Sequence, residues 1–143
     1  MSTSPVRSSQ FLPTVIEQCR KRRSKLKLAD SMGAKLTGGE TLVRALVLRR
    51  VLRRHFLAEN EQMIGIMLPP TVAGAIANLA LALDRRVSVN LNFMLSRNAL
   101  DQCIEQAALR HIITSRKPDD LPAFMMTICQ AVKEISPALA GKR

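Results

Sequence analysis

Short apolar runs alternate with longer helical patterns through the middle of the chain, over residues 62–115. Runs at 64–68, 87–91 and 111–114 have the length of strands, and the segments between them have the length of helices. Parallel strands need long crossover connections, so this order is typical of β-α-β units. The pattern therefore predicts an α/β fold with a small parallel β-α-β-α-β sheet, arranged as a three-layer fragment with flanking helices.

The two helices predicted between these strands differ in how their apolar residues are distributed. Residues 72–83 are apolar almost all round, which indicates burial on several sides and a partner layer beyond the fragment's own sheet. The next helix follows Ser96 and has one apolar face, formed by Leu100, Cys103, Ile104, Ala107 and Ala108. On this face Cys103 is expected to be a packed thiol. His111, at the start of the last strand, is expected to be a structural histidine.

A β-hairpin and a long helix are predicted before this unit. Residues 25–37 read as two short strands around a turn at 30–33, where Gly33 can take a positive φ. Thr37 and Glu40 have the spacing of a capping box, which predicts a helix over residues 38–56. We expect a broad apolar face on this helix, formed by Leu42, Val43, Leu46, Val47, Val51 and Leu52, with arginines Arg44, Arg49, Arg50, Arg53 and Arg54 lining much of the rest.

These patterns divide the chain into three parts. Residues 1–24 are Ser-rich and then strongly basic, and we expect a flexible or partly helical N-terminus. Residues 25–117 carry the ordered α/β pattern. Residues 118–143 have an apolar stripe that predicts an amphipathic helix followed by a tail.

The cysteines and the longest uncharged run bear on where the protein works. Cys19, Cys103 and Cys129 are odd in number and form no C-x-x-C pair, which predicts buried thiols in a reduced, cytoplasmic protein. No secretory signal is expected, because no apolar segment follows the first basic residue. Residues 63–83 carry no charge over a length that could span a bilayer, but Pro69-Pro70 interrupts them, so a strand, a turn and a helix are predicted instead.

The strongly positive charge of the chain points to binding functions. The net charge is +11 and the pI is near 10.8, a balance that favours acidic partners. The basic clusters Arg20–Lys27 and Arg49–Arg54 would serve a small binding protein for nucleic acid or for an acidic carrier protein, but a solvated face and favourable cations at a helix C-terminus are their more ordinary explanation. Aromatic residues make up 3% of the chain, with no Trp or Tyr, so a stacking platform for nucleic acid is missing. Peripheral contact with the inner face of a membrane is a further alternative.

The sequence contains no complete catalytic or metal-binding motif. No phosphate-binding loop, dinucleotide fingerprint or nucleophile elbow is present, so we name no catalytic and no metal-ligating residue. Gly38-Gly39 before a helix could bind an anion through free N–H groups, which is a weak signal. Glu59 and Glu61 are expected to be loop residues.

Three segments, residues 28–46, 64–93 and 96–117, together resemble the N-terminal part of the AMP-forming acyl-CoA and acyl-acyl-carrier-protein synthetase superfamily. They read LADSMGAKLTGGETLVRAL, IGIMLPPTVAGAIANLALALDRRVSVNLNF and SRNALDQCIEQAALRHIITSRK. The nearest likeness is to the synthetase domain of the bifunctional 2-acylglycerophosphoethanolamine acyltransferases. The chain departs from the family's usual residues in having Gly38 in place of Tyr, Arg85 in place of a turn glycine and Ser88 in place of Pro.

The resemblance implies an acyl-activating ligase of fatty acid and lipid metabolism that uses ATP, Mg²⁺ and either CoA or acyl carrier protein. In the family, the ATP-phosphate loop and the lysine-bearing C-terminal domain follow the position of Lys117, and neither is recognisable in this sequence. We therefore expect no cofactor to be bound and no acyl-adenylate to be formed by this chain alone, and a partner chain carrying the missing part is one possibility. The resemblance assigns Asn90, Asn92, Arg116 and Lys117 to the thiol-carrier side.

Overall fold

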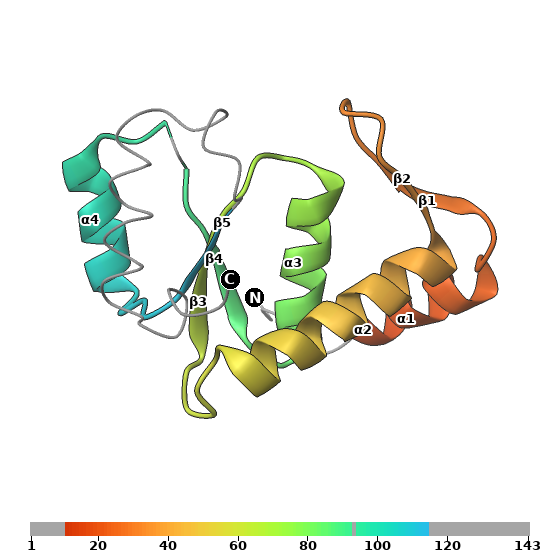
Figure 1. Cartoon of the computed structure of the whole chain (residues 1–143), viewed down its shortest axis with the longest axis horizontal. Helices are drawn as coiled ribbons and strands as arrows, with labels where there is room; N and C mark the ends of the chain where they lie inside the picture. Colours follow the sequence, from red (N-terminus) through yellow and green to blue (C-terminus); the bar gives the residue numbers. More distant parts are fainter. Residues whose placement is uncertain (1–10, 93, 115–143) are drawn as a thin grey trace, which may run out of the picture.

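The computed structural model describes residues 11–92 and 94–114, and within them it has the predicted α/β fold (Figure 1). The elements follow the chain in the order α1 (Phe11–Lys21), β1 (Leu26–Ala29), β2 (Lys35–Thr37), α2 (Gly38–His55), β3 (Met63–Met67), α3 (Val72–Leu83), β4 (Val87–Asn90), α4 (Arg97–Gln106) and β5 (Ile112–Thr114). β1 and β2 form the predicted antiparallel hairpin. The helix and tail predicted for residues 118–143 lie outside the described residues.

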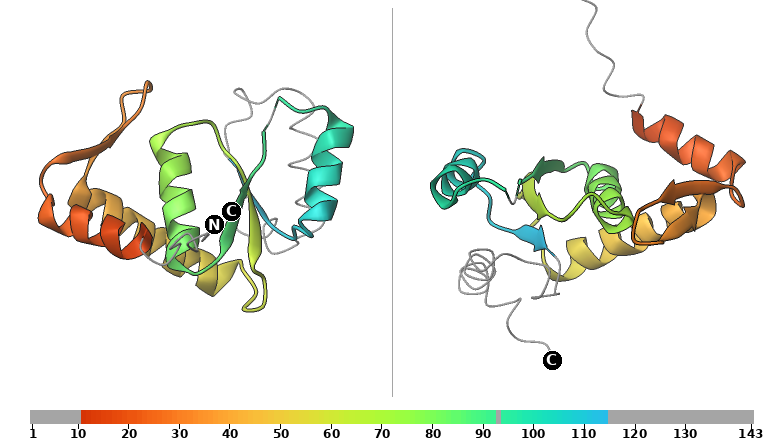
Figure 2. Two further views of the ribbon diagram at one scale, coloured as in Figure 1. Left: turned by 180° about the vertical axis from the view of Figure 1, so that it is seen from behind. Right: turned by 90° about the horizontal axis from the view of Figure 1, so that it is seen from above.

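The parallel sheet has the strand order β4-β3-β5, with β3 in the centre. α4 covers one face of this sheet, while α3 and the C-terminal end of α2 cover the other (Figures 1 and 2). The layers therefore run helix, sheet, helix, as the alternating pattern predicts. The hairpin extends away from the sheet along the N-terminal end of α2 (Figure 2).

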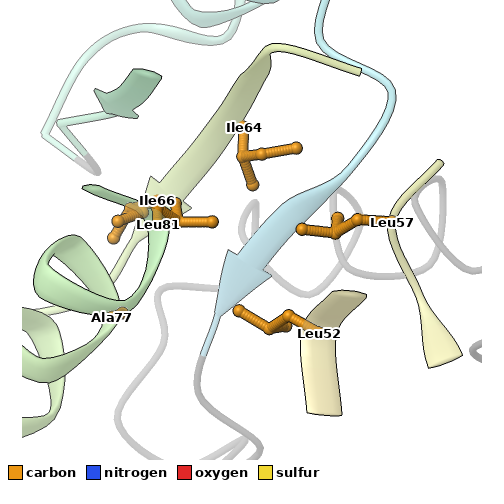
Figure 3. Close-up of a cluster of buried hydrophobic side chains, with 6 residues drawn as sticks. All are labelled: Leu52, Leu57, Ile64, Ile66, Ala77 and Leu81. Carbon is orange, nitrogen blue, oxygen red and sulfur yellow. The ribbon is translucent and has the colours of Figure 1, made fainter. Parts of the chain in front are cut away.

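Alternation along β3 divides its side chains between two cores. Ile64 and Ile66 are almost fully buried against Leu81 of α3 and Leu52 of α2, in the cluster drawn in Figure 3. Met67 points the other way and packs with Leu91 and Leu100 on the side of α4. A strand buried on both faces is what a near-continuous apolar run predicts for a parallel sheet.

α3 finds its covering layer within this chain. Val72 and Ile76 pack with Ala45 of α2 and Leu36 of the hairpin, while Ala77 and Leu81 pack against the sheet. The partner layer expected beyond the sheet is therefore present, and α2 with the hairpin supplies it. Ala73 and Ala75 are its exposed positions.

α2 buries a different face from the one that we expected. Its buried residues are Gly38, Thr41, Ala45 and Leu52, of which Ala45 packs with α3 and the hairpin and Leu52 with α3 and β3. Four of the six predicted apolar positions are exposed instead, namely Val43, Leu46, Val47 and Val51. Small side chains on the inner face let two helices pack closely, which explains why Thr41 and Ala45 lie inside.

The start of α2 is fixed as the capping box predicts. Thr37 Oγ1 accepts from the Glu40 N–H, and Glu40 Oε2 accepts from the Thr37 N–H at 2.8 Å. The N–H groups of Gly38 and Gly39 donate to the carbonyls of Lys25 and Arg23. The anion site suggested by Gly38-Gly39 is therefore wrong, because both donors are already used.

Gly38 also explains one departure from the resembling family. A Cβ atom at this position would lie 2.7 Å from the Arg22 carbonyl oxygen and 2.8 Å from that of Cys19. Both are backbone atoms at the end of α1, so they cannot move aside as a flexible side chain would. Glycine at position 38 is what allows α1 to lie against α2, and the Tyr usual in the family would not fit.

The long uncharged run folds as a strand, a turn and a helix, as predicted. β3 ends before Pro69-Pro70, and α3 begins after Thr71, whose side chain caps the helix. In the described part of the chain no helix is both long enough and apolar enough to cross a membrane.

Candidate functional site

A pocket of about 470 Å³ opens at the carboxyl ends of β3 and β4, beside the N-terminus of α3. Its walls come from the ends of the two strands, the loop between β3 and α3, and the first turns of α3. The lining residues are Ile66, Leu68, Pro69, Pro70, Thr71, Gly74, Ala75, Asn78, Asn90, Leu91 and Asn92. In open parallel sheets, this edge is where ligands are usually bound.

Three asparagines bring amide groups into this pocket. Asn78 and Asn90 bond reciprocally, with each Nδ2 donating to the other's Oδ1 at 3.1 Å. Ser88 Oγ donates to Asn78 Oδ1 at 2.7 Å, and Asn78 Nδ2 also donates to the Gly74 carbonyl at 2.9 Å. The half-buried Asn78 is thereby held in one orientation, and it holds the exposed Asn90 in turn.

Asn90 and Asn92 keep hydrogen-bonding capacity for a ligand. Asn92 Oδ1 accepts from the Met94 N–H at 2.9 Å, and the Nδ2 group of Asn92 donates no hydrogen bond within the described residues. Asn90 uses one donor and one acceptor in the pair with Asn78, and an amide has further sites of both kinds. The two exposed amides can therefore donate to and accept from a neutral polar group.

The lining residues that the structure describes carry no ionisable side chain. Charged groups bind best where charge-assisted hydrogen bonds are available, and the described lining offers none. Leu68, the two prolines and Leu91 add apolar surface. The pocket is suited to a neutral chain that combines amides with methylene groups, and it is poorly suited to a phosphate.

Thr114 stands at the same edge of the sheet. It is the last residue of β5 and pairs in register with Met67 of β3. Its Oγ1 atom is buried and has no hydrogen-bond partner among the described residues. A buried hydroxyl without a partner is unusual, because desolvation is then uncompensated.

The structure brings two of the four predicted site residues together. Asn90 and Asn92 both line the pocket, whereas Arg116 and Lys117 lie outside the described residues. Asn78 and Ser88 were not predicted as part of the site. Asn78 was visible as the one polar residue in the apolar helix 72–83, and Ser88 lies two residues before Asn90, on the same side of the strand.

The opposite, amino-terminal edge of the sheet holds a buried network of charged residues. Asp84 Oδ1 accepts from Arg49 Nε at 3.0 Å, and Asp84 Oδ2 accepts from Arg86 Nε at 2.7 Å. Arg86 also donates to the carbonyls of Ala58 and Glu61. Burial acts to raise the pKa of Asp84, but the bonds from Arg86 and Arg49 outweigh it and hold that pKa below its usual value.

Glu61 and His111 form a second pair at this edge. The Glu61 side chain is 3% exposed, and its Oε2 lies 2.8 Å from Nδ1 of His111. Glu61 is a loop residue, as expected, but its burial was not foreseen, and His111 has the structural setting that we predicted. Because these residues lie at the edge away from the pocket and tie loops to strands, they support the fold.

Magnesium and ATP phosphates are not matched by the residues that the structure describes. Over 11–92 and 94–114, no group of three or more His, Cys, Asp or Glu side chains could hold a metal ion. The pocket is also uncharged. The ATP and Mg²⁺ implied by the resemblance would therefore depend on residues other than these.

The fold is similar to a part of several solved structures, among them an adenylation protein and a CoA ligase. The N-terminal subdomain of NpsA from Klebsiella oxytoca matches with a TM-score of 0.65 and 20% identity, over 78% of this chain and 28% of that chain. A benzoate CoA ligase from Burkholderia xenovorans LB400 matches with a TM-score of 0.66 and 22% identity, over 92% of this chain and 24% of that chain. No protein-family model and no curated protein sequence matches the chain.

A third solved structure extends the likeness to a fused enzyme. It is NpsA-ThdA, an artificially fused adenylation-PCP di-domain from Klebsiella oxytoca, with a TM-score of 0.65 and 18% identity over 78% of this chain and 21% of that chain. The chain thus spans between 21% and 28% of the length of these solved chains. At these identities the likeness establishes the fold alone, which this chain shares with a part of each of these solved structures.

Proposed function

We propose that this chain supplies the N-terminal part of an AMP-forming acid-thiol ligase, and that its pocket receives the neutral arm of the thiol carrier. The observation that supports this most is the pair of exposed amides, Asn90 and Asn92, at the carboxyl edge of the sheet. The pantetheine portion of CoA, and of the arm of an acyl carrier protein, is a neutral chain that carries amides and methylenes, which matches the uncharged described lining. Fatty acids are the substrates that the sequence resemblance favours.

The chain's part in this reaction would be binding and orientation. Asn78 and Ser88 hold Asn90 in place, so that its free amide groups are directed before a ligand arrives. Such preorganised binding increases the rate of a transfer reaction, because it fixes the geometry of the reacting groups. We propose that the chain alone forms no acyl-adenylate. We also propose that the reaction takes place in the reduced cytoplasm, where Cys19 and Cys103 stay free thiols.

Ligand binding to the pocket tests the first part of this proposal. Side-chain amide signals of Asn90 and Asn92 should shift in NMR spectra when pantetheine is added, and should shift little with adenosine 3′,5′-bisphosphate, the charged end of CoA. Asn90→Ala should weaken pantetheine binding several-fold, while Asn60→Ala, an exposed asparagine at the opposite edge, should leave it unchanged. Unchanged spectra with pantetheine, or equal effects of the two variants, would refute the assignment.

An ATP–pyrophosphate exchange assay tests the second part. The purified chain with ATP, Mg²⁺ and a fatty acid should give no exchange above background. Measurable exchange that persists after further purification would overturn the claim that the chain does not adenylate alone, without affecting the binding result for pantetheine.

A further inference from the structure

α2 presents an apolar strip to solvent on the side away from the sheet. Val43, Leu46, Val47 and Val51 are 57%, 42%, 58% and 40% exposed. Their spacing of three and four residues places them on one face of the helix. The opposite face already supplies Thr41, Ala45 and Leu52 to the core, so the exposed strip contributes little to the stability of the described fold.

Exposed arginines lie within and beside this strip, and three of them make no ion pair in the described structure. Arg44, Arg50, Arg53 and Arg54 are exposed on the same helix. Arg49 pairs with Asp84, and Arg44 acts on Glu40, whose pKa is held down first by bonds from Thr37 and then by that charge. Arg50, Arg53 and Arg54 make no ion pair within the described residues. The helix dipole favours cations in the last turn, where Arg53 and Arg54 lie, and so does not explain Arg50.

We propose that this outer face of α2 is a docking surface for an acidic amphipathic helix of a partner protein. Residues 43, 47 and 51 form a ridge with a spacing of four, which is the kind of ridge that packs into the groove of another helix. Glutamates or aspartates beside the partner's apolar stripe would pair with Arg50, Arg53 and Arg54. The charges on the two sides would set the orientation and speed the encounter.

The side chains favour a helical partner over a lipid surface. Helices that lie in a membrane interface insert bulky groups such as Trp, Phe and Leu, whereas three of the four exposed residues here are valines. Valine side chains are short and stiff, so they form a firm, flat ridge. The pocket and this face lie on different elements, so the inference does not depend on the function proposed for the pocket.

Fluorescence anisotropy with two designed peptides tests the proposal. The probe is a labelled helical peptide of about 18 residues, which is about 27 Å long. It has Leu on one face and Glu on both sides of that face. The control is a peptide of the same composition in which the Leu positions are scrambled around the helix. The chain should bind the amphipathic peptide at least about tenfold more tightly, a difference of about 1.4 kcal/mol.

Variants locate the binding surface. Val43→Ser with Val47→Ser, and separately Arg50→Ala with Arg54→Ala, should each weaken binding of the amphipathic peptide about tenfold or more. The control Arg97→Ala with Arg110→Ala removes two exposed cations near α4 and should have little effect beyond the loss of net charge. All four positions changed on α2 are exposed, so circular dichroism and the thermal midpoint should stay close to those of the parent chain.

Three results would overturn the inference. Equal affinity for the scrambled peptide would mean that the surface attracts any polyanion. Equal losses in the α2 variants and the α4 control would place binding elsewhere. Tight association with vesicles containing phosphatidylserine, reduced by the α2 variants and not accompanied by peptide binding, would assign the face to a lipid surface instead.

Discussion

Arg85 and Ala108 have left-handed backbone, with φ of 59° and 48°, and within the described residues they are the positions other than glycine that do so. Each lies directly after the C-cap of a helix, Asp84 for α3 and Ala107 for α4. This position favours glycine, because a Cβ atom meets the neighbouring carbonyl. The family that the sequence resembles usually has glycine where this chain has Arg85, and the structure shows why glycine would suit the turn.

Replacing Arg85 with glycine should therefore stabilise the protein. We expect the free energy of unfolding to rise by about 0.5–1 kcal/mol in Arg85→Gly, the relief of left-handed strain being partly offset by the greater freedom of glycine in the unfolded chain. Urea denaturation should show a higher midpoint with an unchanged slope. The matched change Arg50→Gly, on the exposed side of α2, should lower the stability by about 1 kcal/mol. A lower midpoint in Arg85→Gly would contradict this account.

At the scale of elements, Asp30 joins the hairpin to α3. Its Oδ1 accepts from the N–H groups of Met32 and Ala34 within the turn, and its Oδ2 accepts from the Val72 N–H, the first of α3, at 2.9 Å. The bond from Val72 is the largest of the influences that hold the pKa of Asp30 below its usual value, and burial opposes it. A residue of the hairpin turn thus satisfies a backbone donor at the start of a distant helix.

This contact should make part of the stability depend on pH. A carboxyl with a lowered folded pKa stabilises the fold above its unfolded pKa of about 4, and the contribution is lost as the pH falls through the folded pKa. Asp30→Asn should be less stable than the parent chain near neutral pH, and the difference should shrink at a pH of about 2.5. Chemical denaturation at both pH values measures it.

Ser31→Ala is the control for this change. Ser31 is exposed and lies in the same turn, so its replacement should leave the pH dependence of stability as it is in the parent chain. Hydrogen exchange at the Val72 amide gives a second readout, since that N–H should exchange faster in Asp30→Asn. A difference in stability between Asp30→Asn and the parent that does not change with pH would refute the role of the charge.

At the scale of the whole molecule, the network around Asp84 connects parts that are far apart in sequence. Asp84 follows α3, Arg86 precedes β4, Arg49 lies on α2, and the carbonyls of Ala58 and Glu61 belong to the loop before β3. The side chains of Asp84 and Arg86 are each 7% exposed. The amino-terminal edge of the sheet is therefore held by buried charges, while the described lining of the pocket at the other edge has none.

Removing one member of this network should destabilise the whole described fold. Asp84→Asn would leave Arg86 buried without a charged partner, at an expected loss of about 3 kcal/mol or more. Arg49→Met removes the more exposed partner and should cost less, which provides a variant that folds if Asp84→Asn does not. Asp101→Asn, in an exposed pair with Arg97, should cost less than about 0.5 kcal/mol. Urea midpoints that fail to follow this order would contradict the assignment.

The elements of the fold could be predicted because local signals agree with one another. Strand-length runs, the capping box at Thr37 and Glu40, and the proline pair after β3 each act on near neighbours, and the structure confirms each of them. The buried face of α2 could not be predicted in the same way. Apolar residues occur nearly all round that helix, so the pattern does not determine which face is buried. The buried face is set by the close packing of Thr41 and Ala45, which depends on contacts distant in sequence.

The residues of the candidate site that the sequence did not predict are also set by contacts distant in sequence. Asn90 and Asn92 came from the family resemblance, whereas Asn78 is brought to them by the packing of α3 on the sheet, across 12 residues of chain. The pair of Glu61 and His111 spans 50 residues, and no periodicity reveals such a contact. The structure does not describe Arg116 and Lys117, and their role remains a prediction.

The fit of α1 against Gly38 has an evolutionary consequence. Because any larger side chain at this position would collide with the main chain of Cys19 and Arg22, a mutation to tyrosine is tolerable only after the N-terminal helix has shifted or been lost. With the helix in this place, a larger residue at position 38 cannot be reached by a single substitution. Homologous sequences should accordingly show glycine at 38 together with a helix that ends as this one does, and tyrosine only without it.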